Sequence, residues 1–178
     1  MLDHLTSPIG EIVILTDDQG RLRALDWLEH EHRMRKLLSS QYRPTGIQII
    51  EGRAPTAIRT PIAQYFRGKV AAIDAISVET AGTPFQRKVW QTLRRIPAGK
   101  TSTYGSLATR IGRPAAVRAV GFANGANPIS VVIPCHRLIG SDGSLTGYGG
   151  GLERKRWLIE HERVVLGTPR GRVRFASR

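Results

Sequence analysis

Short apolar segments separated by turn residues predict a small α/β unit in the first half of the chain. Residues 11–15 and 22–27 are rich in apolar residues, and the turn-rich stretch 16–20 lies between them, which is typical of a β-hairpin. After the hairpin, the apolar spacing predicts a helix over 30–42, a short strand over 47–50 and a helix over 55–66.

The second half begins with three predicted helices. Thr83 and Pro84 are typical of a helix start, and the helix after them has apolar residues at helical spacing: Phe85, Val89, Leu93 and Ile96. Thr103 can cap a second helix over 104–111, and a third helix covers 115–126. The glycine-containing turn 112–114 gives the last two helices the spacing of a helix-turn-helix, although many core helical hairpins share that spacing.

The positive charge of the chain lies in its second half. The 178 residues include 27 Lys and Arg against 14 Asp and Glu, a formal net charge of +13. Residues 1–82 are neutral in sum, and no acidic residue lies between Glu79 and Asp142. Such a stretch of one sign favours a polyanion partner, most often nucleic acid, over a merely soluble basic domain. We expect domains over 1–82 and 83–165, and a basic tail over 166–178 that adds phosphate affinity.

Other features of the composition exclude several classes of protein. No segment approaches the roughly eighteen apolar residues of a membrane span, and the first residues do not resemble a signal peptide. We therefore expect a cytoplasmic protein with no membrane partner. The single cysteine, Cys135, cannot form an internal disulfide or a thiolate-rich zinc site. Asp17, Asp18 and Asp26 could form a metal cluster, but turn aspartates far more often accept local backbone hydrogen bonds. We expect no metal and no cofactor.

Cys135 has neighbours that suit a nucleophile. It follows Pro134 and precedes His136 and Arg137, and nearby cations stabilise the reactive thiolate. The alternative interpretation is a buried, inert cysteine. His136 is the adjacent candidate base, and three acids could orient it: Glu153, Glu160 and Glu162. Adjacent residues of an extended chain face opposite sides, so a turn or a bridging water must connect the thiol and the imidazole.

Several motifs follow one another over residues 82–162. They are Pro134-Cys135-His136-Arg137, the preceding Asn127-Pro128, and the following Gly147-Tyr148-Gly149-Gly150-Gly151 with Lys155, Trp157, Leu158 and Glu162. Further motifs lie at 83–90, 104–108 and 118–121. In this combination the chain resembles the O6-alkylguanine-DNA alkyltransferases, strongly over 82–162 and in outline over the first half.

The resemblance implies a DNA-repair reaction at Cys135. This thiol would accept an alkyl group, such as methyl, from the O6 atom of guanine in double-stranded DNA, with O4 of thymine as an open alternative. The thioether would persist, so each molecule would act once as a methyltransferase and as its own acceptor. His136 would take the thiol proton through a water, and Glu162 would orient His136. Asn127 would order this network, and Tyr104 would donate a proton to the departing guanine and crowd the target phosphate.

The resemblance also implies how the DNA is held. Arg118 would replace the extruded base, with the helix-turn-helix in the minor groove. Other DNA contacts would come from Thr83, Gln86, Tyr104, Ala115, Ala119 and Ala123, and the base pocket would be lined by Tyr148, Gly149, Gly150, Val132 and Leu138. Gly149 stands where some relatives carry serine, so its main-chain amide is the expected donor. The implied fold is an α/β N-terminal domain with a small, antiparallel, ribonuclease-H-like sheet, and a mainly α, winged-helix-like C-terminal domain.

Two other functions are alternatives. A non-catalytic helix-turn-helix protein that binds alkylated DNA would lack the reactive cysteine, whereas Cys135, His136 and Glu162 are all present. A Cys-His hydrolase would turn over repeatedly and would leave Arg118 and the acid-free stretch unexplained. We expect double-stranded DNA as the partner and a monomer in solution, with cooperative assembly on DNA as an open alternative.

Overall fold

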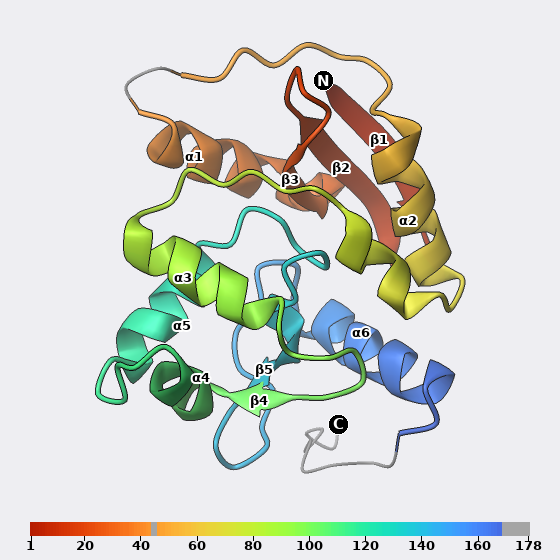
Figure 1. The fold of residues 1–178 in the computed structure, drawn as a ribbon. Helices are drawn as coiled ribbons and strands as arrows, with labels where there is room; N and C mark the ends of the chain where they lie inside the picture. Colours follow the sequence, from red (N-terminus) through yellow and green to blue (C-terminus); the bar gives the residue numbers. More distant parts are fainter. Residues whose placement is uncertain (44–45, 169–178) are drawn as a thin grey trace. The chain divides into compact units, whose positions relative to one another are not determined.

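The contacts of the chain define two units, which we call unit 1 and unit 2. The computed structural model describes residues 1–43 and 46–168. Unit 1 consists of Met1–Thr83 together with Pro128–Val132, and unit 2 of Pro84–Asn127 together with the described residues from Ile133 onward (Figure 1). The expected boundary after residue 82 differs from this division mainly at 128–132, which we had placed with the second domain.

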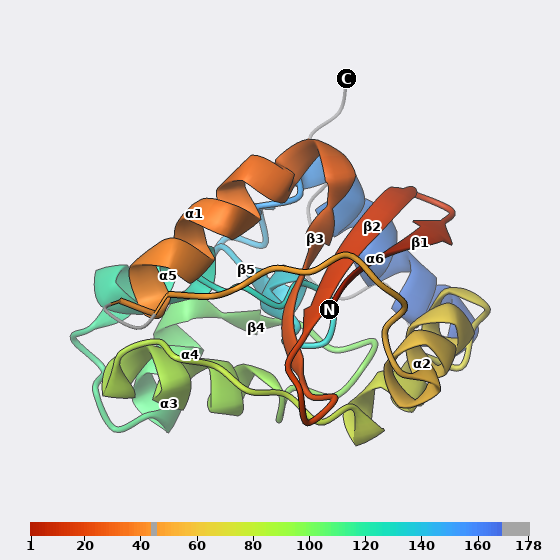
Figure 2. The same ribbon diagram turned by 90° about the horizontal axis from the view of Figure 1, so that it is seen from above.

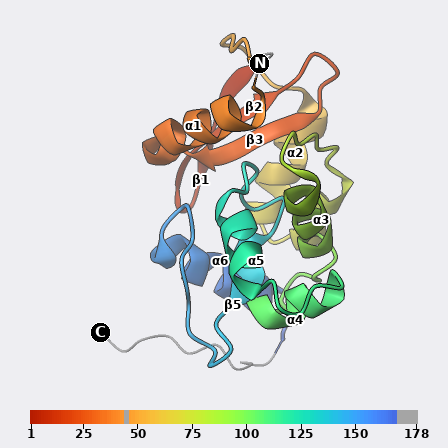
Figure 3. The same ribbon diagram turned by 90° about the vertical axis from the view of Figure 1, so that its left-hand side faces the viewer.

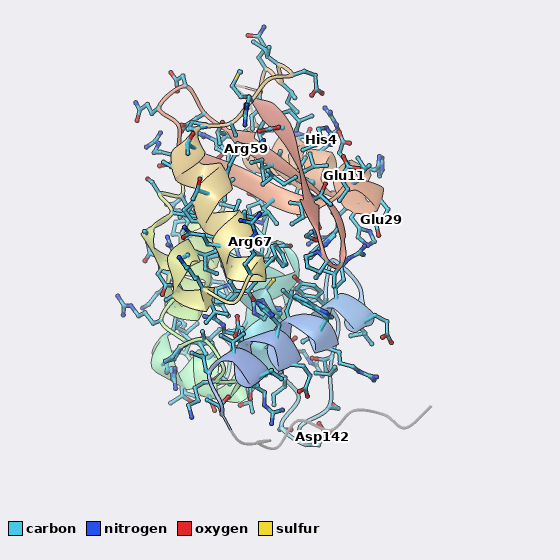
Figure 4. All side chains as sticks on the ribbon, turned by 90° about the vertical axis from the view of Figure 1, so that its right-hand side faces the viewer. His4, Glu11, Glu29, Arg59, Arg67 and Asp142 are labelled. Atoms are coloured by element: carbon cyan, nitrogen blue, oxygen red, sulfur yellow. The ribbon has the colours of Figure 1, made fainter. Side chains whose placement is uncertain are left out.

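Unit 1 is built on a three-stranded antiparallel sheet. Its strands are β1 (Leu2–Ser7), β2 (Gly10–Thr16) and β3 (Leu22–Trp27), in the order β1-β2-β3 (Figure 2). The predicted hairpin is therefore confirmed, whereas β1 was missed because polar residues interrupt its apolar pattern. The imidazole of His4 in β1 and the carboxylate of Glu11 in β2 form a cross-strand hydrogen bond of 3.1 Å on this sheet (Figure 4).

Two helices cover the sheet of unit 1. They are α1 (Glu31–Gln41) and α2 (Thr56–Phe66), with 3₁₀ turns at Leu28–His30 and Val70–Ala75. Met34 and Leu38 of α1 lie in one core cluster with residues of all three strands, and Arg59 of α2 forms an ion pair with Asp3 of β1. The predicted strand over 47–50 is wrong: backbone pairing there is limited to a single bridge between Leu2 and Glu51.

Residues 128–132 join unit 1 by pairing with β3. The Leu25 amide donates to the Pro128 carbonyl at 2.9 Å, and the Ser130 amide donates to the Leu25 carbonyl at 2.8 Å. Within this segment Val131 has a φ of 68°, a left-handed conformation that is costly for a β-branched residue. The segment thus has a defined, strained path at the point where the chain returns toward Cys135.

Unit 2 contains the three predicted helices and the cysteine motif (Figure 3). Its elements are α3 (Pro84–Leu93), β4 (Ser102–Thr103), α4 (Tyr104–Arg110), α5 (Val117–Gly125), a 3₁₀ turn (Cys135–Arg137), β5 (Leu138–Ile139) and α6 (Leu152–Val165). The short strands β4 and β5 pair in parallel. The indole nitrogen of Trp90 in α3 donates to the Ala123 carbonyl in α5 at 2.8 Å, which fixes the rotation of α5 against α3.

The turn between α4 and α5 has the geometry that its sequence predicts. Gly112 has a φ of 75°, and the amides of Gly112 and Arg113 donate to the carbonyls of Thr109 and Ala108, both at 2.9 Å. These two bonds form a Schellman motif, which needs glycine at the left-handed position. At the start of α4, the Thr103 hydroxyl accepts from the Ser106 amide at 3.1 Å, as expected of an N-cap.

Three further sequence expectations concern membrane spans, the turn aspartates and the basic tail. No helix in the described part of the chain is long and apolar enough to cross a membrane. Asp17 accepts backbone hydrogen bonds from Gln19 and Arg21, as predicted for a turn aspartate. From residue 169 onward the basic tail, with Arg170, Arg172, Arg174 and Arg178, lies outside the described residues.

Candidate active site

The thiol of Cys135 accepts a hydrogen bond from Asn127, an asparagine that follows α5. Cys135 opens the 3₁₀ turn that follows Pro134 and is 4% exposed. The side-chain amide of Asn127 donates to Cys135 Sγ at 3.1 Å and to the Ile133 carbonyl at 2.9 Å. Because an N–H donor interacts more strongly with a thiolate than with a thiol, this contact favours the reactive form of the sulfur. The 3₁₀ turn also supplies the bend that adjacent cysteine and histidine residues require.

His136 is paired with one of the three acids that the sequence left open. Its Nε2 lies 3.0 Å from Glu162 Oε1, and both side chains are almost fully buried. Glu160 instead lies 3.5 Å from Arg163, and Glu153 is exposed in the first turn of α6. A carboxylate can only accept, so Nε2 carries the hydrogen and Nδ1 is the acceptor. Within the described chain, Nδ1 is buried and has no hydrogen-bond partner.

Arg137 anchors the same carboxylate from the other side. Its Nε and Nη2 donate to Glu162 at distances of 2.7 to 3.2 Å, and its Nη1 donates to the Ile96 carbonyl at 2.6 Å. The Gly99 amide donates to the second Glu162 oxygen at 3.0 Å. Arg137 and Glu162 therefore connect α6 and the segment that follows α3 to the cysteine turn. The sequence motif contained Arg137 without indicating this role.

The electrostatics of this cluster keep Glu162 charged and His136 neutral. Burial opposes ionisation of Glu162, but His136 and Arg137 outweigh it and hold the pKa of this carboxyl well below its usual range. Burial lowers the pKa of His136, and the Glu162 carboxylate only partly offsets that effect because Arg137 already neutralises it. A neutral imidazole with a free acceptor nitrogen can take up a proton at neutral pH.

Tyr104 lies at the start of α4 within a second polar chain. The Thr146 hydroxyl donates to Tyr104 Oη at 3.0 Å, and the Nζ of buried Lys155 donates to the Thr146 carbonyl at 2.8 Å. Burial raises the pKa of Tyr104, the hydrogen bond from Thr146 offsets this only in part, and the nearby Cys135 raises it further, so the phenol keeps its proton. Burial lowers the pKa of Lys155 to about 8. Because Thr146 is the donor in its bond with Tyr104, the phenolic hydrogen is available for another acceptor.

Most of the residues predicted for the base pocket lie in unit 2. The ring of Tyr148 stands edge-on to His136, with 6.5 Å between the ring centroids. Leu138 is buried in β5, Gly150 is buried, and Gly149 is half-buried. Val132 belongs to unit 1, so its part in the pocket stays a prediction.

The residues predicted to contact DNA differ in how exposed their side chains are. Arg118, Ala115 and Ala119 are exposed and Gln86 is half-buried, whereas Thr83 is the last residue of the first part of unit 1. Ala123 is 2% exposed, and its carbonyl accepts from the Trp90 indole nitrogen, so its DNA contact stays a prediction. On α5 the most exposed apolar side chain is instead Phe122, which we had not predicted.

The helices α3, α4 and α5 of unit 2 carry basic residues and no acidic residue. Exposed basic side chains lie on α3, on α4 and in the turn before α5: Arg87, Lys88, Arg110 and Arg113. The first acid after Glu79 is Asp142, in the loop that follows β5 (Figure 4). Arg118 is exposed near the start of α5.

Comparison with known proteins assigns these features to one family. Residues 84–164 match the model described as 6-O-methylguanine DNA methyltransferase, DNA binding domain. The methylated-DNA–protein-cysteine methyltransferase of Salmonella typhimurium is 49% identical over 164 residues, covering 92% of this chain and 96% of that protein. The enzyme of the same name from Haemophilus influenzae is 41% identical, covering 97% and 93%. A crystal structure of Mycobacterium tuberculosis OGT in complex with DNA has a TM-score of 0.72 and 37% identity, covering 91% and 92%. The resemblance in the motifs is thus confirmed, and the chain belongs to the 6-O-methylguanine DNA methyltransferase family.

Proposed function

We propose that this chain repairs alkylated DNA by direct reversal, transferring an alkyl group from guanine O6 in double-stranded DNA to its own Cys135. Relatives that match nearly the whole chain carry the name methylated-DNA–protein-cysteine methyltransferase. The observation that carries the proposal is the buried arrangement of the thiol, with Asn127 on its sulfur and the neutral His136 held by Glu162. These groups activate a sulfur nucleophile and provide a base for its proton.

The transfer is a displacement at the alkyl carbon. The thiol proton passes through a water to Nδ1 of His136, whose Nε2–H remains bonded to Glu162. The sulfur then forms a bond to the alkyl carbon while the bond from that carbon to O6 breaks, and its electron pair leaves with the guanine. The phenol of Tyr104 donates a proton to the departing base, which restores a neutral guanine. Thr146, by donating to Tyr104 Oη, leaves that phenolic proton free to move.

The target base must leave the stack to reach a buried thiol. Cys135 is 4% exposed, so guanine O6 cannot approach it while the base is paired within the duplex. Exposed Arg118 fills the space left by the extruded base, and the small residues of the exposed face of α5 allow that helix to enter the minor groove. The proposed pocket residues are Tyr148, Gly149, Gly150 and Leu138, with the Gly149 amide as a donor. Thymine alkylated at O4 is the second candidate substrate.

Replacing Arg118 with alanine should slow transfer from duplex DNA about 10- to 100-fold, because unstacking costs a few kcal/mol and the inserted side chain offsets part of it. Reaction with free O6-methylguanine base should fall far less, since no base leaves a stack. Second-order rates with both substrates measure the difference. Arg113→Ala is the matched control, because it removes an exposed cation from the adjacent turn. Its rate with duplex DNA should fall only by the loss of one phosphate contact. Equal losses with both substrates would contradict the insertion role.

Intact mass spectrometry tests the reaction itself. Incubation with duplex DNA containing O6-methylguanine should add one methylene to each protein molecule, and peptide mapping should place it on Cys135. Repair should stop at one equivalent, since a thioether has no bond that water readily cleaves. Many equivalents repaired per molecule would favour the Cys-His hydrolase class, and binding with no mass gain would favour the non-catalytic DNA-binding protein.

The finer description of the fold belongs to the same proposal. The antiparallel β1-β2-β3 sheet with α1 and α2 supports a ribonuclease-H-like first domain over 1–82. The helix-turn-helix of α4 and α5, together with the short strands β4 and β5, supports a winged-helix-like second domain over 83–165. A cytoplasmic location and a monomeric state in solution stay predictions.

A further inference from the structure

Phe122 is the most exposed of the large apolar side chains in the described chain. It lies in α5 with an exposed fraction of 80%, whereas Val117 in the same helix is 39% exposed. Burying an aromatic ring is among the largest hydrophobic contributions that one residue makes to stability, and exposed Phe122 does not make it. A single exposed apolar residue can be incidental, so its surroundings decide whether this ring has a partner.

The surroundings place Phe122 beside the residue proposed to enter the duplex. Phe122 and Arg118 are four residues apart, so their side chains point only about 40° apart around the helix and about 6 Å apart along it. The other exposed residues of α5 are shorter, Val117, Ala119 and Gly125, while the opposite face is buried: Val120, Ala123 and Asn124. The ring and the guanidinium are thus the two long side chains exposed on α5, and they project one turn apart.

The charge around this face favours a duplex over a protein as the occupant. No acidic residue occurs between Glu79 and Asp142, and exposed Arg110 and Arg113 lie in α4 and the adjoining turn. Phosphates would meet these cations, while the sugars and base edges of the minor groove offer apolar surface to the ring. A second copy of this chain would instead bring the same positive charges to the contact and be repelled.

We infer that Phe122 is a second element of duplex recognition, packing in the minor groove one helical turn from Arg118. The inference rests on the proposed function, since it takes α5 as the helix that faces the DNA. Apolar side chains inserted at base steps unstack and bend a duplex. Phe122 therefore favours the opened duplex that Arg118 occupies, and it assists extrusion of the target base without touching the reacting atoms.

Duplex binding by three variants tests the inference. Phe122→Ala should weaken binding of an undamaged, labelled duplex about 10-fold, equal to about 1.4 kcal/mol, and Phe122→Leu should weaken it less. Val164→Ala is the matched control, because Val164 in α6 is 77% exposed and equally apolar, and it should stay within about twofold of the parent chain. Fluorescence anisotropy measures the affinities, and thermal unfolding checks that each variant is folded.

Two further readouts separate a groove contact from a general weakening. A phenyl ring releases no counterions, so the slope of log affinity against log salt should match the parent chain for Phe122→Ala, whereas Arg113→Ala should reduce it by about 1. In alkyl transfer, Phe122→Ala should lose more rate with duplex O6-methylguanine than with the free base. The parent chain has three tryptophans, so its own fluorescence is the reference. When duplex is added, the tryptophan fluorescence of Phe122→Trp should be quenched more than that of the parent chain.

The outcomes distinguish this inference from the proposed function. If the parent chain binds and repairs duplex DNA while Phe122→Ala matches Val164→Ala in affinity and rate, Phe122 is not a DNA contact. If the parent chain forms a dimer that Phe122→Ala abolishes, with duplex affinity unaltered, the ring serves a second copy of the chain and the inference is wrong. If the parent chain neither binds duplex nor gains mass, the proposed function itself fails.

Discussion

Cys135→Ser is expected to abolish alkyl transfer, leaving no detectable mass gain after incubation with duplex O6-methylguanine. A serine hydroxyl ionises far less readily than a thiol, so the Asn127 amide, at 3.1 Å from the sulfur in the parent chain, has no anion to stabilise. His136 and Glu162 cannot compensate, because a neutral imidazole of lowered pKa is too weak a base to generate an alkoxide. Intact mass measured over a time course checks the loss.

Duplex affinity is the control for this variant. Cys135 is buried and replaced by a residue of similar size, so binding of undamaged duplex should stay within about twofold, and thermal unfolding should confirm folding. A methyl group found on the introduced serine or on any other side chain would show that the sulfur is not the required acceptor. Loss of binding together with transfer would leave the acceptor role unsupported and point to a structural role for Cys135.

Arg137→Met is expected to be among the most destabilising single substitutions in unit 2, lowering the free energy of unfolding by about 3 kcal/mol. Arg137 makes three contacts with the buried Glu162 carboxylate and one with the Ile96 carbonyl. Without the guanidinium, Glu162 still has His136 and the Gly99 amide as partners. The decrease in the free energy of unfolding should therefore be at the low end of the range for broken buried ion pairs. Urea unfolding followed by tryptophan fluorescence measures it.

A double-mutant cycle separates the ion pair from general packing. The double variant Arg137→Met with Glu162→Gln should lose less free energy of unfolding than the sum of the losses in the two single variants. The reason is that the double variant contains no uncompensated buried charge. Arg95→Met is the control, since Arg95 is exposed and its loss should change stability by less than about 0.5 kcal/mol. Additive losses in the cycle would contradict a coupled pair.

The pH dependence of stability tests the same ion pair independently. The folded pKa of Glu162 is depressed, so its contribution is present above the unfolded pKa and is lost as pH falls below about 4.5. Without Arg137 the folded pKa of Glu162 rises toward the unfolded value. The Arg137→Met variant should therefore lose less stability on acidification than the parent chain, and a steeper acid loss would contradict this account.

Local sequence patterns predicted the helices of unit 2 because their causes are local. Thr103 caps α4, Gly112 allows the left-handed turn before α5, and apolar spacing marks α3. The short strand over 47–50 failed because a few apolar residues suit a strand or a packed loop equally well, and sheet pairing decides between them. The strand β1 was missed for the same reason, since its pairing with β2 outweighs its polar residues.

Residue types and their order along the chain already indicated the chemistry of this protein, a thiol beside an imidazole in a basic, acid-free half. Tertiary contacts decided which groups act together. Glu162, and neither Glu153 nor Glu160, holds His136, because the path of α6 brings that carboxylate to Arg137. Trp90 sets the rotation of α5, so that Ala123 is buried and Phe122 is exposed. Both outcomes depend on contacts between residues far apart in the chain, which periodicity and spacing do not specify.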